Sequence, residues 1–91
     1  MKLDDYREKI DAVDEKLVAL FAERMELSRA IAEYKKENGL PVLDVSREEE
    51  KLHRVAERSP EELREYTRRL YTLLFELSRD YQRELIGKES G

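Results

Sequence analysis

Apolar side chains recur along residues 3 to 34 at steps of three and four. The seam that they form consists of Leu3, Tyr6, Ile10, Val13, Leu17, Leu20, Arg24, Leu27, Ile31 and Tyr34. This alternation is typical of a helix that packs lengthwise against other helices. Nine of these ten side chains are apolar or aromatic, so Arg24 is an exception inside a strong pattern and requires an explanation.

Composition extends the helical pattern to the whole chain. Charged residues make up 44% of the sequence, tryptophan is absent, and glycine and proline together number only five (3 and 2). Such a chain favours long exposed helices over strands, and its 91 residues suit one domain over 1–91. The predicted fold is therefore all-α, with one long, one short and one long helix. They span residues 4–38, 46–57 and 60–86.

Residues that favour helix starts and stops set these bounds. Gly39 follows the first helix in the position where a left-handed residue often ends a helix, and Pro41 lies just beyond it. A capping box of Ser46 and Glu49 is expected to open the second helix. The third helix is expected to start with Ser59, Pro60 and Glu62 as cap, first residue and third residue, and to stop at Gly87.

The first helix is too long for its own molecule. Thirty-five residues of helix span about 52 Å, whereas a compact chain of this size has a diameter of only about 31 Å. The seam would then be exposed over much of its length unless a second chain covers it. We therefore expect an intertwined helical homodimer, because a two-fold arrangement is the simplest closed solution.

Polar residues interrupt the apolar faces of all three helices. Arg24 and Lys35 share one face of the first helix, about 16 Å apart, so they could grip two ends of one small ligand. Arg7 lies about 26 Å from Arg24 along the axis. It could join them only from a partner chain, whose antiparallel first helix would cross between residues 15 and 16. The other candidates are Ser78 with Gln82, and Asp44 with Arg47 and Glu48.

Charge and cysteine content narrow the functional classes. Eighteen basic and 22 acidic residues are interspersed and give a net charge of −4, so no basic field favours nucleic acid or a membrane surface. The chain has no cysteine and no long apolar run or leader, which is typical of a soluble cytoplasmic protein. No metal-ligand spacing, phosphate-binding glycine loop or nucleophile with a base is present, so we expect neither a metal nor a cofactor.

A non-catalytic interpretation accounts for each polar residue separately. A lone arginine in a seam often fixes the register of a helical dimerisation module or extends its charge to solvent. Ser78 and Gln82 alone are typical of the edge of a core, and the run "REEEK" over 47–51 is typical of a solvated helix face.

Three segments together resemble the all-helical chorismate mutases of the small AroQ type. These segments are "YREKIDAVDEKLVALFAERMELSRAIAEYK", "PVLDVSREEE" and "LLFELSRDYQREL", and the likeness runs from Tyr6 to about Leu85. The resemblance implies a dimeric enzyme that rearranges chorismate to prephenate without a cofactor, on the route to phenylalanine and tyrosine. Isochorismate pyruvate lyases share the fold and much of the cationic site, so that activity remains the alternative within the family.

The resemblance also implies a role for each polar residue. Lys35 and Gln82 would donate hydrogen bonds to the ether oxygen of the breaking bond, and Glu48, near Asp44, would accept one from the ring hydroxyl. Arg24 would pair with the side-chain carboxylate, with Arg47 nearby. The ring carboxylate would be held by Ser78 and by Arg7 of the other subunit.

Overall fold

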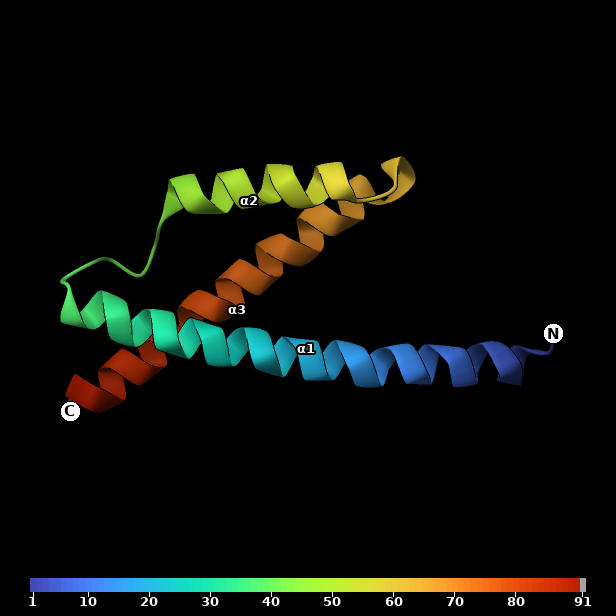
Figure 1. Ribbon diagram of the computed structural model, residues 1–91, viewed down its shortest axis with the longest axis horizontal. Helices are drawn as coiled ribbons and strands as arrows, with labels where there is room; N and C mark the ends of the chain where they lie inside the picture. The colour runs from blue at the N-terminus through green and yellow to red at the C-terminus, as the bar shows by residue number, and fades with distance from the viewer. Residues whose placement is uncertain (91) are drawn as a thin grey trace.

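The computed structural model describes residues 1–90, the side chains as far as Gly87, as three α-helices (Figure 1). They are α1 (Leu3–Glu37), α2 (Val45–Arg58) and α3 (Arg64–Ser90), with a short 3-10 helix, η1 (Glu61–Leu63), leading into α3. No strand occurs within residues 1–90. The all-α prediction is confirmed. Over the same residues, no helix combines the length and the apolar character that a membrane crossing requires.

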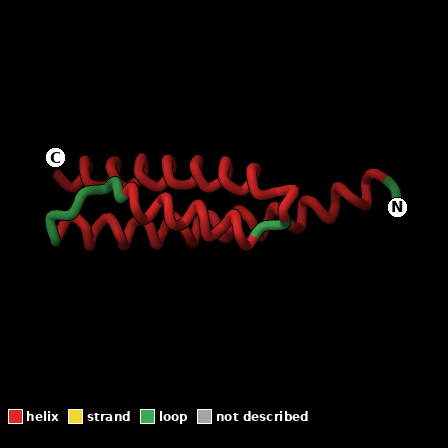
Figure 2. Tube along the Cα trace, turned by 90° about the horizontal axis from the view of Figure 1, so that it is seen from above, coloured by secondary structure: helices red, strands yellow, loops and turns green. Residues whose placement is uncertain are grey.

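The third helix holds the other two together. It contacts both α1 and α2, and it crosses the C-terminal half of α1 at an angle (Figure 1). The N-terminal end of α1 extends beyond the other helices as a single projecting arm, which is also seen in the second view (Figure 2). The chain measures 54 × 27 × 14 Å and has a radius of gyration of 16.5 Å, against about 12 Å for a compact domain of this length.

The core of a single chain is small. Its buried apolar residues are Ala32, Val55, Ala56 and Phe75, and three polar residues, Ser28, Ser78 and Gln82, are buried beside them. All nine apolar members of the α1 seam are between 48% and 64% exposed. An apolar surface of this extent is rare on a stable monomer.

The first helix ends in a Schellman motif. Gly39 has a φ of 63°, a left-handed conformation that glycine adopts without penalty. The Leu40 amide donates to the Lys35 carbonyl at 2.8 Å, and the Gly39 amide donates to the Lys36 carbonyl at 3.4 Å. The predicted stop at Gly39 is confirmed, and this turn places Lys35 at the edge of the loop that leads to α2.

The predicted capping box of α2 is wrong. The helix begins at Val45, and its N-cap is Asp44, whose carboxylate accepts a hydrogen bond from the Arg47 amide at 3.0 Å. Ser46 consequently lies inside the first turn, where its side chain cannot cap. Asp44 and Ser46 are both favourable N-cap types. Ser46 was predicted because Glu49 follows it by three residues, as in a capping box, but the helix uses Asp44.

The predicted ends of the third helix are also wrong. Ser59 ends α2, and its hydroxyl lies 2.9 Å from the Val55 carbonyl oxygen and 2.7 Å from Thr67 Oγ1. The chain then passes through η1, so the α-helix begins at Arg64 and not at residue 60. At the other end α3 continues through Gly87 to Ser90. Gly87 does not stop the helix, because glycine disfavours a helix interior by only about 1 kcal/mol.

Candidate active site

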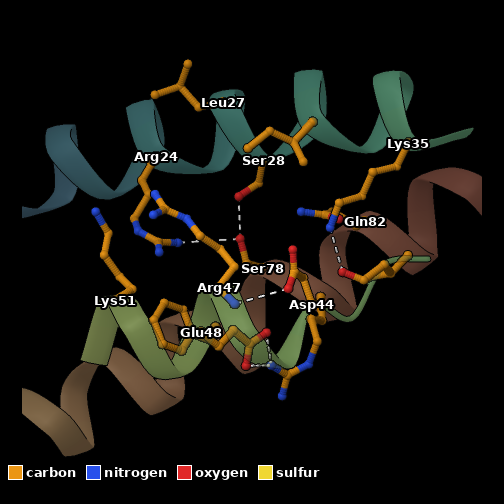
Figure 3. A pocket seen from close by; sticks show the side chains of 14 residues that line it. Arg24, Leu27, Ser28, Lys35, Asp44, Arg47, Glu48, Lys51, Ser78 and Gln82 are labelled. Atoms are coloured by element: carbon orange, nitrogen blue, oxygen red, sulfur yellow. Dashed lines mark hydrogen bonds and ion pairs between the residues drawn. The ribbon is translucent and has the colours of Figure 1, made fainter. Parts of the chain in front are cut away.

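Residues of the three helices and of the α1–α2 connector line a half-open cavity of about 340 Å³ (Figure 3). This volume suits a small organic ligand. Its walls come from the C-terminal half of α1, the start of α2 and the middle of α3. The lining residues are Arg24, Leu27, Ser28, Ile31, Lys35, Val42, Asp44, Arg47, Glu48, Lys51, Phe75, Ser78, Arg79 and Gln82.

Seven of the eight residues proposed from the sequence line this cavity. The eighth, Arg7, does not. It lies on the projecting arm of α1, where its exposed guanidinium is 3.8 Å from Asp4. A single chain therefore does not bring Arg7 to the other seven residues.

Arg24 extends from α1 toward three residues of α3. Its Nη1 lies 3.5 Å from Ser78 Oγ, and its guanidinium lies 5.9 and 5.7 Å from the ring centres of Tyr71 and Phe75. Ser78 is also hydrogen-bonded to Ser28 of α1. None of the ion pairs described for residues 1–87 includes Arg24. This cation is therefore held in place by a hydroxyl and by aromatic faces, and it remains available to an anion.

Two potential donors lie at the other end of the cavity. Lys35 Nζ donates to the Val42 carbonyl oxygen at 2.7 Å, which orients the ammonium and leaves its other two protons available. Gln82 is buried, and its Oε1 has no hydrogen-bond partner among the described residues. An unpaired buried amide oxygen costs about 1 to 3 kcal/mol. A ligand that pairs with this amide would therefore recover that cost, and a half-turn of the amide exchanges its oxygen for the donating NH2 group.

The two carboxylates of the cavity already have partners. Asp44 caps α2, as described above, and Glu48 accepts hydrogen bonds from Arg79 Nη1 at 2.5 Å to Oε1 and 2.6 Å to Oε2. Asp44 thus has a structural role that the sequence analysis did not assign to it. Glu48 is fixed by a residue of α3 that lies 31 positions further along the chain.

Lys51 is a cation of the cavity that the sequence analysis missed. Burial lowers the pKa of Lys51 from 10.5, and the neighbouring charges of Arg47, Arg54, Arg58 and Arg24 lower it further. A lysine is destabilised in this way when like charges gather without enough anions to balance them. The signal available in the sequence was weak, because Lys51 falls one turn after Arg47 in a run that resembles a solvated face.

The cavity is strongly cationic although the chain as a whole is acidic. Five cations (Arg24, Lys35, Arg47, Lys51 and Arg79) and two carboxylates (Asp44 and Glu48) line it, which leaves a formal charge of 5 − 2 = +3. Leu27, Ile31 and Phe75 supply apolar walls. The fold and the cavity together define an all-helical protein with a cavity whose charge and size suit a small anion carrying more than one negative charge.

Comparison with known proteins identifies the family. Residues 6–83 match the family model described as chorismate mutase type II. A 47-residue segment is 45% identical to the chorismate mutase of Methanocaldococcus jannaschii, and it covers 52% of this chain and 48% of that protein. A 49-residue segment is 49% identical to the bifunctional chorismate mutase/prephenate dehydratase of Escherichia coli K12, and it covers 54% of this chain and 13% of that protein. The chain therefore belongs to the chorismate mutase type II family, and the resemblance drawn from its sequence is confirmed.

The matched segments cover about half of the archaeal relative and a smaller share of the bifunctional one. The family membership extends over most of the chain, whereas the pairwise likeness to each relative is confined to a part of it.

Proposed function

We propose that this protein is a chorismate mutase, which rearranges chorismate to prephenate in the biosynthesis of phenylalanine and tyrosine. The observation that carries the proposal is the gathering of seven residues from three separate segments around one cationic cavity. Chorismate is a dianion of a size that suits this cavity. Two cations that lie eleven positions apart on α1, Arg24 and Lys35, line the same cavity and could contact different groups of one bound dianion.

The reaction is an intramolecular rearrangement, so it needs no nucleophile and no proton transfer. The protein has two tasks, which are to hold the compact conformer of the substrate and to stabilise the negative charge that develops on the ether oxygen. Arg24, with Arg47 nearby, would bind the side-chain carboxylate, and Ser78 would help to hold the ring carboxylate. Such anchoring of two ends supplies the orientation effect.

Stabilisation of the ether oxygen is assigned to Lys35 and Gln82. A millionfold acceleration requires a barrier lower by about 8 kcal/mol, and one well-aimed donor to a developing oxyanion contributes about 3 to 4 kcal/mol. Two donors combined with selection of the reactive conformer could therefore account for the acceleration. Lys35 is already oriented by the Val42 carbonyl, which favours the preorganised geometry that this effect requires.

A homodimer would complete the site. The exposed seam of α1 offers a surface for a second copy, and the projecting arm carries Arg7 away from its own cavity. In an antiparallel pair that crosses between residues 15 and 16, Arg7 of one chain would lie level with Arg24 of the other. Arg7 would then supply a cation near the ring carboxylate. The cytoplasmic location stays a prediction.

The direct test is the disappearance of chorismate in the presence of the purified protein, with the product identified. Arg24→Ala is assayed alongside. Prephenate formed by the parent and not by the variant is the expected result. If the parent leaves chorismate unchanged, the proposal is refuted, and release of pyruvate from isochorismate would then assign the lyase activity in its place.

A further inference from the structure

Arg79 and Glu48 form an ion pair unlike the others that the structure describes. Their side chains are only 23% and 25% exposed, and Arg79 Nη1 contacts both oxygens of the carboxylate, at 2.5 and 2.6 Å. The other ion pairs described within residues 1–87 join residues three or four positions apart on one helix, and each of their side chains is at least 45% exposed. The Glu48–Arg79 pair instead joins α2 to α3, and both of its members line the cavity.

The position of the Glu48–Arg79 pair indicates a role beyond the small stabilisation that an exposed ion pair provides. An exposed ion pair contributes about 0 to 1 kcal/mol, and its loss leaves two solvated charges. Loss of Arg79 would instead leave the half-buried Glu48 carboxylate without a counter-charge in the cavity proposed to bind a dianion. It would also release the Glu48 side chain, because no other hydrogen bond to its carboxylate is described within residues 1–87.

We infer that Arg79 is a positioning residue, which holds the Glu48 carboxylate in place to accept a hydrogen bond from the ring hydroxyl of the substrate. The inference rests on the proposed function. A carboxylate has about four acceptor sites. Arg79 approaches both oxygens through a single nitrogen, so acceptor sites remain for the hydroxyl. The guanidinium also offsets the repulsion between Glu48 and a bound dianion.

The role predicts a loss that depends on the substrate hydroxyl. In Arg79→Met, Glu48 can rotate away, and a misplacement of about 1 Å at a positioned group costs up to about a hundredfold in rate. We expect kcat/KM for chorismate to fall about 10- to 100-fold. For an analogue in which the ring hydroxyl is replaced by hydrogen, the loss in Arg79→Met should be clearly smaller, because only the uncompensated Glu48 charge then opposes binding, whereas a general structural defect would lower kcat/KM equally for both substrates.

Further variants separate positioning from other effects. The control is Arg68→Met. Arg68 lies on the same helix and pairs with Glu65 at 3.5 Å, but it does not line the cavity, so this variant should retain the parent activity. The double variant Glu48→Gln/Arg79→Met should have the same kcat/KM as Glu48→Gln alone, because a residue that acts only through the Glu48 carboxylate has nothing left to position. Arg79→Lys keeps a cation at the site and should recover part of the lost kcat/KM.

The experiment measures kcat and KM for chorismate and for the analogue in all of these proteins, together with thermal unfolding. Equal activity of Arg79→Met and Arg68→Met overturns the inference, as does a multiplicative loss in the double variant. If Arg79→Met does not fold, the analogue comparison is made on Arg79→Lys, and an equal loss on both substrates overturns the inference. An inactive parent overturns the proposed function and this inference with it, whereas an active parent confines the failure to Arg79.

Discussion

The sharpest test of the site is Arg24→Leu, because it converts the seam to an uninterrupted apolar pattern. If Arg24 binds a substrate carboxylate, its removal takes away the main partner of that carboxylate in a half-buried cavity, and the loss of one partner of a buried charge pair costs about 3 to 5 kcal/mol. Since 1.36 kcal/mol corresponds to a tenfold change in rate, kcat/KM should fall by roughly two to nearly four orders of magnitude.

The same substitution should leave the fold intact. The contacts that it removes are a 3.5 Å hydrogen bond to Ser78 and two approaches to aromatic rings. Each ring contact is worth roughly 0.5 to 1 kcal/mol, and the leucine side chain regains a comparable amount by packing against Tyr71 and Phe75. The melting temperature should therefore stay within about 5 °C of the parent value or rise.

Two measurements decide the outcome, namely the steady-state rearrangement of chorismate and thermal unfolding followed by circular dichroism. Loss of turnover with an unchanged or higher melting temperature is the expected pair of results. The reasoning is refuted if the variant retains kcat/KM within tenfold of the parent. In that case the arginine sets the register of a helical dimer, as the non-catalytic interpretation of the sequence holds.

Three further substitutions test separate parts of the molecule. Lys35→Ala should lower kcat by about 10²- to 10³-fold with little change in melting temperature, and near-normal turnover would contradict its assignment to the ether oxygen. Lys51→Met should raise the melting temperature, because the lowered pKa of Lys51 reflects burial and repulsion from neighbouring arginines. A bound dianion would raise the pKa of Lys51 again. Affinity for a dianionic inhibitor should therefore fall as pH rises through the pKa of Lys51 in the free protein, which lies below 10.5. Titration calorimetry should find a weaker pH dependence of this affinity in Lys51→Met. Ile10→Glu places a charge in the exposed seam, so the dimer should dissociate and activity should fall, and sedimentation of a dimeric variant would count against the proposed interface.

The sequence predicted the helices well because their determinants are local. The periodic seam runs the length of α1, and Gly39 takes the left-handed conformation in which glycine is favoured. The errors arose where two local signals competed. Asp44 and Ser46 are both suitable caps two positions apart, and the hydrogen bond from the Arg47 amide selects Asp44. Pro60 can open a helix, but here the chain forms a 3-10 turn before α3.

The site was predictable only where one helix, or the family resemblance, determined it. Helical spacing places Arg24 and Lys35 on one face, and both line the cavity. The Glu48–Arg79 pair depends on the register between α2 and α3, which no spacing within one helix reveals. Lys51 was predictable only in part, because Arg47, Arg54 and Arg58 lie at helical spacing around it on α2, whereas its burial and the charge of Arg24 on α1 depend on how the chain folds.

The position of the cavity explains why a chain this small has so little core. Ser28, Ser78 and Gln82 occupy the buried contact between α1 and α3, where apolar side chains would stabilise the fold more. Gln82 even carries an amide oxygen that has no hydrogen-bond partner among the described residues. The exposed seam of α1 can supply the missing apolar burial if two chains pair along it. Dimerisation and substrate binding are then linked physically, because the surface that would replace the lost core also carries Arg7 toward the cavity of the other chain.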